Sequence, residues 1–275
     1  MINSRIGGIK RFFKWCASRQ HIPADVYTAL TTVDGLRRGR SDARESVPVV
    51  AVARENVYAV LPFVSPQVAA LIQVQYLCGM RPGEVTRMRR CELDTSGDIW
   101  LYTPDEHKNA WRGHVLVKAI PRAAQDVLSP FLPAKVDAYL FSPKDADHWY
   151  RANRESNPQR KTPVYPCELR RREEAKRSPR RKAARPKRDH YDTDSYRQAV
   201  LYGISNALKA GIAVAPWTPN QLWHSIATEI SQSIGQQAAQ RWLGHAKLDT
   251  TGIYVEKQVS ELIEIAQALD RKWSA

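Results

Sequence analysis

The chain has 275 residues, of which 43% are apolar and 25% charged, a composition typical of a globular protein with a substantial core. Its 42 Lys and Arg residues against 28 Asp and Glu residues give a formal net charge of +14, which indicates a polyanionic partner, nucleic acid first. No apolar run approaches the roughly 20 residues of a transmembrane helix, and the N-terminus lacks the pattern of a secretory signal. We therefore expect a cytoplasmic protein with no membrane partner.

The four cysteines show no close-spaced pair of the kind that binds a metal ion. Because disulfides form in oxidising compartments, we expect these side chains to be reduced and structural. The sequence predicts no metal site and no other cofactor. The cysteines are Cys16, Cys78, Cys91 and Cys167.

Residues 6–33 have the apolar spacing of two helices, the second opened by Pro23. Two helices of this length cannot bury their apolar faces alone. They are either part of a larger helical domain or a small lead-in packed on the main domain. Residues 37–46 combine alternating charges with no apolar period, so they are the candidate linker.

Ser65 and Pro66 predict the start of a helix, and Gly79 predicts its end. The next turn reads Gly-Met-Arg-Pro-Gly-Glu, from Gly79 to Glu84. It places Arg81 at the mouth of another helix, where a planar guanidinium can bond two oxygens of one phosphate. Taken alone, an ordinary exposed arginine explains the motif equally well.

Residues 98–103 and 114–120 alternate apolar and polar side chains, which predicts two antiparallel strands. The connection between them carries Lys108, and the second strand carries Lys118. A lysine in an exposed connection is usually solvated, so any role for either side chain needs further support.

Residues 142–194 differ from the chain around them. From Arg151 to His190 there are 15 Lys or Arg residues against 5 Asp or Glu, which is most of the net charge of +14. Residues 168–188 have no apolar face, and we expect them to be mobile without a partner. We interpret the segment as an insertion that follows a phosphate backbone, the alternative being a merely solubilising loop. The candidate DNA-binding residues are Arg170, Arg171, Arg172, Arg180, Arg181, Lys182, Lys187 and Arg188.

Another helix is predicted from Pro219, with Thr218 as its N-cap and Gln221 as the capping-box partner. Apolar residues at every fourth position face the core. They leave Asn220 and Trp223 together on a neighbouring face, because residues three apart adjoin on a helix. That face can present its side chains to a ligand.

A shorter helix is predicted at 236–242, with Gly244 as a left-handed cap and His245 just past its end. Tyr254 follows nine residues after His245. Residues 259–273 then form an amphipathic stripe that predicts a C-terminal helix.

In their order and spacing, these motifs resemble the catalytic half of the tyrosine recombinases, the phage-integrase family of DNA strand-exchange enzymes. In that family a helix carries His-x-x-Arg, followed by Leu-Gly-His and, nine residues later, a nucleophilic tyrosine. Residues 243–245 and Tyr254 match the last two motifs. Asn220 stands where the family has histidine, and Trp223 stands where it has the second catalytic arginine.

The resemblance implies a site-specific recombinase or integrase that acts on double-stranded, nucleoid-associated DNA without metal. Tyr254 would attack a DNA phosphate to form a 3′-phosphotyrosine, with His245 and Asn220 bonding that phosphate. Arg81 would neutralise the phosphate, and Glu84 would help to hold Arg81.

The family also places a lysine on such a hairpin to protonate the leaving 5′ oxygen. We assign this general acid to Lys108, with Lys118 as the lesser candidate.

The implied fold is mainly α with a small antiparallel β-sheet (α+β). Residues 1–36 would be the last helices of a truncated helical core-binding domain, 37–46 the linker, and 47–275 the catalytic domain with its basic insertion at 142–194. The C-terminal helix would support self-association on DNA by docking on a neighbouring subunit, or it would pack on its own domain.

Trp223 is the severe departure from the family pattern. A neutral indole cannot supply the charge of a guanidinium, and losing one preorganised donor costs about 10²- to 10³-fold in rate. Two interpretations follow: a recombinase impaired by Trp223, or a catalytically inactive integrase-like DNA-binding protein or mobile-element remnant.

Overall fold

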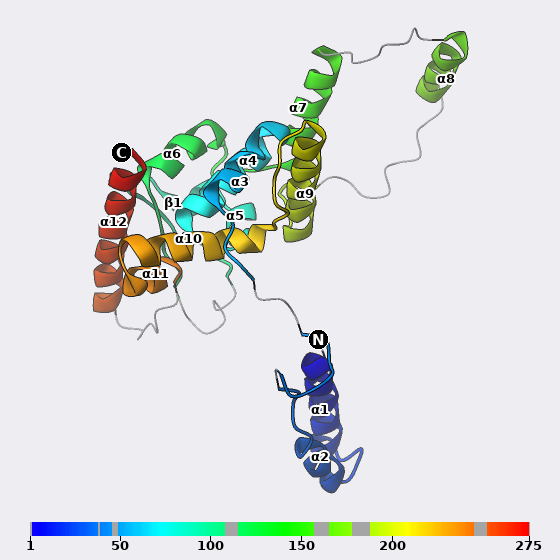
Figure 1. Cartoon of the computed structure of the whole chain (residues 1–275), viewed down its shortest axis with the longest axis vertical. Coiled ribbons are helices and arrows are strands. Elements are labelled where there is room, and N and C mark those ends of the chain that lie inside the picture. The colour runs from blue at the N-terminus through cyan, green and yellow to red at the C-terminus, as the bar shows by residue number, and fades with distance from the viewer. Residues whose placement is uncertain are drawn as a thin grey trace. The chain divides into compact units, whose positions relative to one another are not determined.

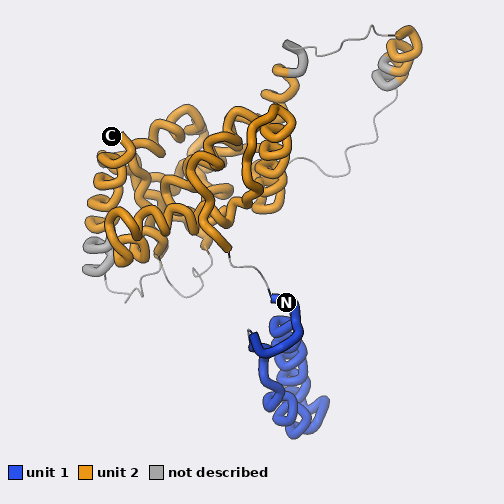
Figure 2. The backbone as a smooth tube through the Cα atoms, viewed as in Figure 1, with its two compact units in different colours: residues 1–48 blue, residues 49–275 orange. Residues whose placement is uncertain are grey.

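The computed structural model describes residues 2–37, 39–45, 49–107, 115–156, 165–177, 188–244 and 252–274, with the backbone alone at 154–156, 172, 175–177 and 252–258. Lys108 and His245 lie outside these ranges. The chain divides into two compact units, residues 1–48 and 49–275 (Figure 2).

The first unit is a pair of helices, α1 (Ile2–Ser18) and α2 (Ala24–Thr31), packed against each other. Asn3 ties α1 to the end of the unit by two hydrogen bonds with the backbone of Leu36, of 2.8 and 2.9 Å. Among the described side chains of this unit, only Cys16 is buried. The unit therefore leaves most of its apolar surface uncovered, as expected for two helices.

The second unit is mainly helical and contains, in its described part, one small antiparallel sheet (Figure 1). Its first half comprises α3 (Arg54–Tyr58), η1 (Leu61–Phe63), α4 (Pro66–Cys78), α5 (Pro82–Thr86), η2 (Arg90–Glu92), β1 (Leu93–Asp94), β2 (Trp100–Tyr102), β3 (Lys118–Ile120), α6 (Arg122–Leu128) and η4 (Ser129–Phe131). Its second half comprises α7 (Pro143–Ser156), α8 (Pro166–Arg177), α9 (Thr193–Lys209), α10 (Pro219–Ser233), α11 (Gln236–Trp242) and α12 (Gly252–Ser274). This architecture confirms the predicted fold class, mainly α with a small antiparallel sheet.

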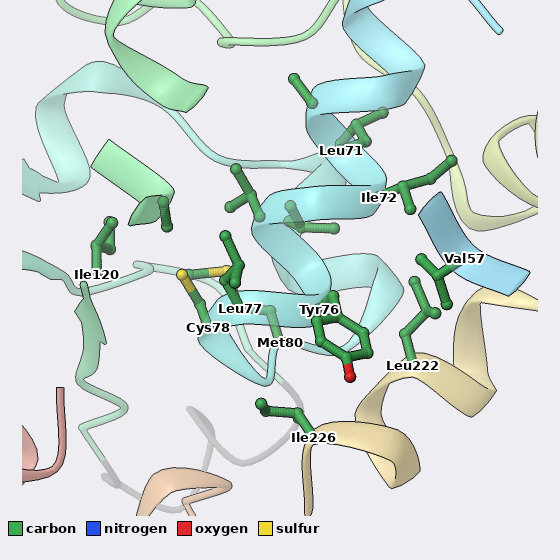
Figure 3. Close-up of a cluster of buried hydrophobic side chains, with 14 of the residues drawn as sticks. Val57, Leu71, Ile72, Tyr76, Leu77, Cys78, Met80, Ile120, Leu222 and Ile226 are labelled. Carbon is green, nitrogen blue, oxygen red and sulfur yellow. The ribbon is translucent and has the colours of Figure 1, made fainter. Parts of the chain in front are cut away.

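Helix α4 runs through the centre of the core. Its start follows the prediction, because the Ser65 hydroxyl accepts a bond from the Val68 N–H and Pro66 occupies the first turn. Its end is the left-handed Gly79, at φ 60°. The sequence indicated a single apolar face, but α4 is buried on several sides, between Leu222 and Ile226 of α10 and Ile120 of β3 (Figure 3).

The sheet differs from the predicted two-stranded hairpin. Its order is β1-β2-β3, with Leu93 opposite Tyr102 and Leu101 opposite Ala119. β1 was not predicted, because two residues are too few to establish an alternating pattern. Residues 118–120 are all buried, including Lys118, so both faces of β3 are covered and an alternating polar face was the wrong expectation.

The segment 142–194, predicted to be a basic insertion, contains core residues near both ends. Ala146 in α7 is buried and α7 packs against α4, while Tyr191 is also buried, so both ends of 142–194 belong to the core. Residues 166–177 form α8, a helix that the sequence analysis did not predict, because Glu, Arg, Lys and Ala have high helix propensity. The described side chains of α8 are exposed or only partly covered.

Helix α12 packs on its own domain, against β3, α6 and α11. Its buried side chains follow the predicted stripe, and the Asp270 carboxylate accepts bonds from the N–H groups of Arg122 and Ala123 at the start of α6. Near its end, Lys272 and the Trp273 indole both bond Glu229 of α10 at 3.1 Å. No helix in the described ranges is both long and apolar enough to cross a membrane.

Candidate active site

The turn between α4 and α5 presents Arg81. The Glu84 carboxylate accepts one bond from the Arg81 backbone N–H at 2.9 Å and another from its Nη1 at 3.0 Å. The Glu84 side chain is 9% exposed, whereas that of Arg81 is 42% exposed. One edge of the guanidinium is thus fixed by Glu84, and part of its surface is open to a ligand.

Arg81 and Asn220 border the same open pocket, of about 720 Å³. Asn220 reaches it from the first turn of α10, whose capping box forms as predicted: the Thr218 N–H donates to the Gln221 side chain at 2.9 Å. Two distant parts of the sequence therefore supply cationic and amide groups to one cavity. Its lining residues are Arg81, Pro82, Gly83, Glu84, Arg87, Asp105, Glu106, His107, Thr193 and Asn220.

Trp223 lies beside Arg81. The Cζ atom of Arg81 is 5.4 Å from the centroid of the Trp223 ring, within the range of a cation–π contact. His224 packs edge-on against the same indole, with the ring centroids 4.9 Å apart. Position 223 is therefore close enough to Arg81 for two side chains there to share one phosphate.

The pocket includes residues that the sequence did not single out. Arg87 lines it and pairs with Glu106 at 3.5 Å, and His107 lies beside them. Arg87 lies one helical turn beyond Glu84, and this spacing could have predicted from the sequence that Arg87 is near the site. Thr193 gave no such signal, because only the packing of α9 against α5 brings it to the pocket.

Lys118, the lesser candidate for the general acid, does not line this pocket. Its side chain is almost fully buried, and Nζ donates to the carbonyl oxygens of Gly79 at 3.3 Å and Trp242 at 2.9 Å. Burial lowers the pKa of Lys118 to about 8. Its ammonium donates to backbone carbonyls inside the core.

The segment that leads to His245 packs against the segment that leads to Arg81. A Cβ atom on Gly79 would lie 2.9 Å from Cδ1 of Trp242 and 3.2 Å from a methyl group of Leu243. Gly244 has φ 73°, the left-handed cap that was predicted after α11. Tyr254 is in the first turn of α12, and its side chain is among those not described.

The phage integrase family model matches residues 63–261 of this sequence. The chain belongs to the phage integrase family. A crystal structure of XerA recombinase is similar, with 16% identity, a TM-score of 0.46, and coverage of 96% of this chain and 82% of that one. The structure of XerH site-specific recombinase bound to difH substrate, a pre-cleavage complex, is also similar, with 13% identity and a TM-score of 0.40. The match covers 82% of this chain and 59% of the XerH chain. Comparison with curated proteins gave no match.

Tyr191 and Tyr202 are alternative candidates for the nucleophile of this integrase-family chain. Tyr191 is buried, and burial raises its pKa to about 12, which disfavours the phenolate. Tyr202 is 63% exposed on α9. Neither tyrosine borders the pocket that contains Arg81.

The basic candidates for DNA binding are only partly described. Arg170 and Arg171 are exposed on α8, and Arg172 belongs to the same helix. Arg188 pairs with Asp192 while its side chain stays 64% exposed. Outside the described ranges lie Arg180, Arg181, Lys182 and Lys187.

Proposed function

We propose that this chain is a DNA-binding tyrosine recombinase that breaks and rejoins DNA strands through a 3′-phosphotyrosine intermediate, slowed by Trp223. The observation that carries the proposal is the Arg81 guanidinium, held by Glu84 at the edge of an open pocket that Asn220 also borders. The family match over residues 63–261 covers Arg81, Asn220, His245 and Tyr254.

In the proposed reaction, the Tyr254 oxygen loses its proton to solvent and attacks phosphorus, and the bond between phosphorus and the 5′ oxygen breaks. Lys108 supplies the proton that the departing 5′ oxygen takes up. The covalent link keeps the free energy of the phosphodiester, so a 5′ hydroxyl can reverse the step and release the tyrosine. Negative charge collects on the non-bridging oxygens in the transition state, and Arg81, His245 and Asn220 would bond them.

Trp223 weakens this arrangement in two ways. It brings no charge to the phosphate, and it covers one face of the Arg81 guanidinium with an aromatic ring. The contact stabilises the free protein by roughly 0.5–1 kcal/mol, because an exposed cation–π pair has about that strength. Replacement of the second arginine thus removes one donor while leaving Arg81 in place.

The missing positive charge at position 223 favours a second candidate function. In this alternative, the chain is a DNA-binding protein of this family that has lost cleavage. Among the described residues, two arginines that could replace the missing one are already paired: Arg87, which lines the pocket, bonds Glu106 at 3.5 Å, and Arg241 bonds Glu261 at 3.0 Å. A chain without a second free cation at the phosphate would bind DNA and not cut it.

We further propose that the insertion contacts the DNA backbone and that copies of the chain associate on DNA. The described residues of α8 offer exposed arginines, which suit phosphate contacts that carry no sequence preference. Because the apolar stripe of α12 is covered by its own domain, an association through this helix would use its polar side.

The deciding experiment detects the covalent adduct. A labelled pool of duplexes with randomised sequence, nicked near one end, loses a short fragment on cleavage and traps the phosphotyrosine. We expect Trp223→Arg protein to give an adduct on denaturing gels, and Tyr254→Phe in that background to give none. An adduct that persists without the Tyr254 hydroxyl would reassign the nucleophile, and the absence of any adduct would favour the DNA-binding alternative.

A further inference from the structure

Three segments from different parts of the chain meet at the buried ammonium of Lys118. Lys118 is the first residue of β3, Gly79 caps the end of α4, and Trp242 is the last residue of α11. Nζ donates to the Gly79 carbonyl at 3.3 Å and to the Trp242 carbonyl at 2.9 Å, and the side chain is 1% exposed.

The position offers two acceptors to a buried ammonium, which offset part of the desolvation that lowers its pKa. The last carbonyl groups of a helix have no partner within the helix, and they form the negative end of its dipole. Here the ends of α4 and α11 both point their carbonyl groups at one ammonium. A neutral apolar side chain would leave both carbonyl oxygens buried without that donor.

The two helix ends are next to catalytic motifs. Gly79 precedes Arg81 by two residues, and Trp242 precedes His245 by three. The packing between them is tight, since a Cβ on Gly79 would approach Trp242 to 2.9 Å and Leu243 to 3.2 Å. Any shift of one helix end is therefore transmitted to the other.

We propose that Lys118 is a positioning residue for strand cleavage, whose ammonium ties the end of α4 to the end of α11, the two helix ends that precede Arg81 and His245 in the sequence. This inference rests on the proposed function. Lys118 touches neither the phosphate nor the leaving oxygen in this proposal. It acts through the backbone of the two motifs, and the general acid stays with Lys108.

The test compares Lys118→Met with its parent, both carrying Trp223→Arg so that cleavage is measurable. Lys118→Gln is the second variant, because it keeps one neutral donor and protects the test if the methionine protein fails to fold. Lys209→Met, which removes a lysine exposed at the end of α9, is the matched control for loss of one positive charge. Adduct formation in a single turnover, DNA affinity and hydrogen exchange of residues 76–82 and 239–244 are measured for each.

We expect Lys118→Met to keep DNA affinity within a few-fold while adduct formation falls at least about 10-fold, with Lys118→Gln between it and the parent. Amide exchange is expected to rise in both segments and to stay unchanged in the Lys209→Met control. Equal adduct rates in the parent and Lys118→Met, or unchanged exchange at the two helix ends, would overturn the positioning role. If the parent itself forms no adduct, the proposed function fails and this inference fails with it, a result distinct from equal, measurable rates.

Discussion

The Trp223→Arg substitution tests the central claim about this site. Arg81 Cζ lies 5.4 Å from the indole centroid, so an arginine at 223 would bring a second guanidinium to within a similar distance. Two unit charges about 5 Å apart repel by roughly 3 kcal/mol at an effective dielectric constant of 20. Because the Arg81 side chain is 42% exposed, solvent and salt reduce this repulsion, and we expect the free protein to lose no more than about 1 kcal/mol of stability.

A bound phosphate reverses this balance. Its negative charge lies between the two guanidinium groups, and the charge that develops in the transition state strengthens both sets of bonds. We therefore expect adduct formation by Trp223→Arg to exceed that of the unaltered chain by at least about 10²-fold, the usual effect of one preorganised donor. DNA affinity should change only a few-fold, because binding draws on many phosphate contacts.

Two control variants distinguish the effect of an added charge from the effect of removing the bulky ring. Trp223→Gln removes most of the ring without adding charge, and Trp223→Lys adds a charge without the planar fork. Adduct formation is timed on the nicked duplexes, and affinity is measured by fluorescence anisotropy at several salt concentrations. Comparable adduct rates for Trp223→Arg and the unaltered chain would refute the reasoning, and an equal gain in Trp223→Gln would show that the ring merely blocks the phosphate.

Three further predictions follow from other parts of the molecule. Replacing residues 157–187 by a short neutral linker, which spares α7 and Tyr191, should flatten the slope of log affinity against log salt in DNA titrations, and an unchanged slope would remove the insertion from the interface. Gly79→Ala should lower the free energy of unfolding by about 1–3 kcal/mol in urea titrations. The reason is that position 79 has φ 60° and that a Cβ there would lie 2.9 Å from Trp242. An unchanged free energy of unfolding would contradict that packing. Burial lowers the pKa of Lys118 from 10.5 to about 8, so between these values the unfolded chain binds more protons and this residue makes stability rise with pH. The comparison is with Lys118→Met, so that the contributions of the other titrating groups cancel. From pH 7.5 to 9.5 the free energy of unfolding of the parent should rise by about 2 kcal/mol relative to that of Lys118→Met. A difference between the two proteins that does not change with pH would show that the pKa of Lys118 is not lowered in this way.

Local signals in the sequence determined where several helices begin and end. The Ser65-Pro66 start and Gly79 end of α4, the capping box at Thr218, and the bounds 236–242 of α11 all reflect interactions among residues within a few positions of one another. Such interactions depend on the local backbone, so they can be predicted without the fold. The spacing of motifs likewise indicated the family that the match to residues 63–261 shows.

Burial and proximity were decided only by the tertiary structure. An alternating strand pattern implied a polar, accessible Lys118, yet the ends of α4 and α11 cover it and supply its two carbonyl partners. The charged segment after α7 contained a helix, and its ends belonged to the core, because Ala146 and Tyr191 find partners far away in the chain. The contact between Arg81 and Trp223 joins residues 142 positions apart, and no local pattern encodes a distance of that kind. Local propensity acts over a few residues, whereas the environment of a side chain depends on which distant elements pack around it.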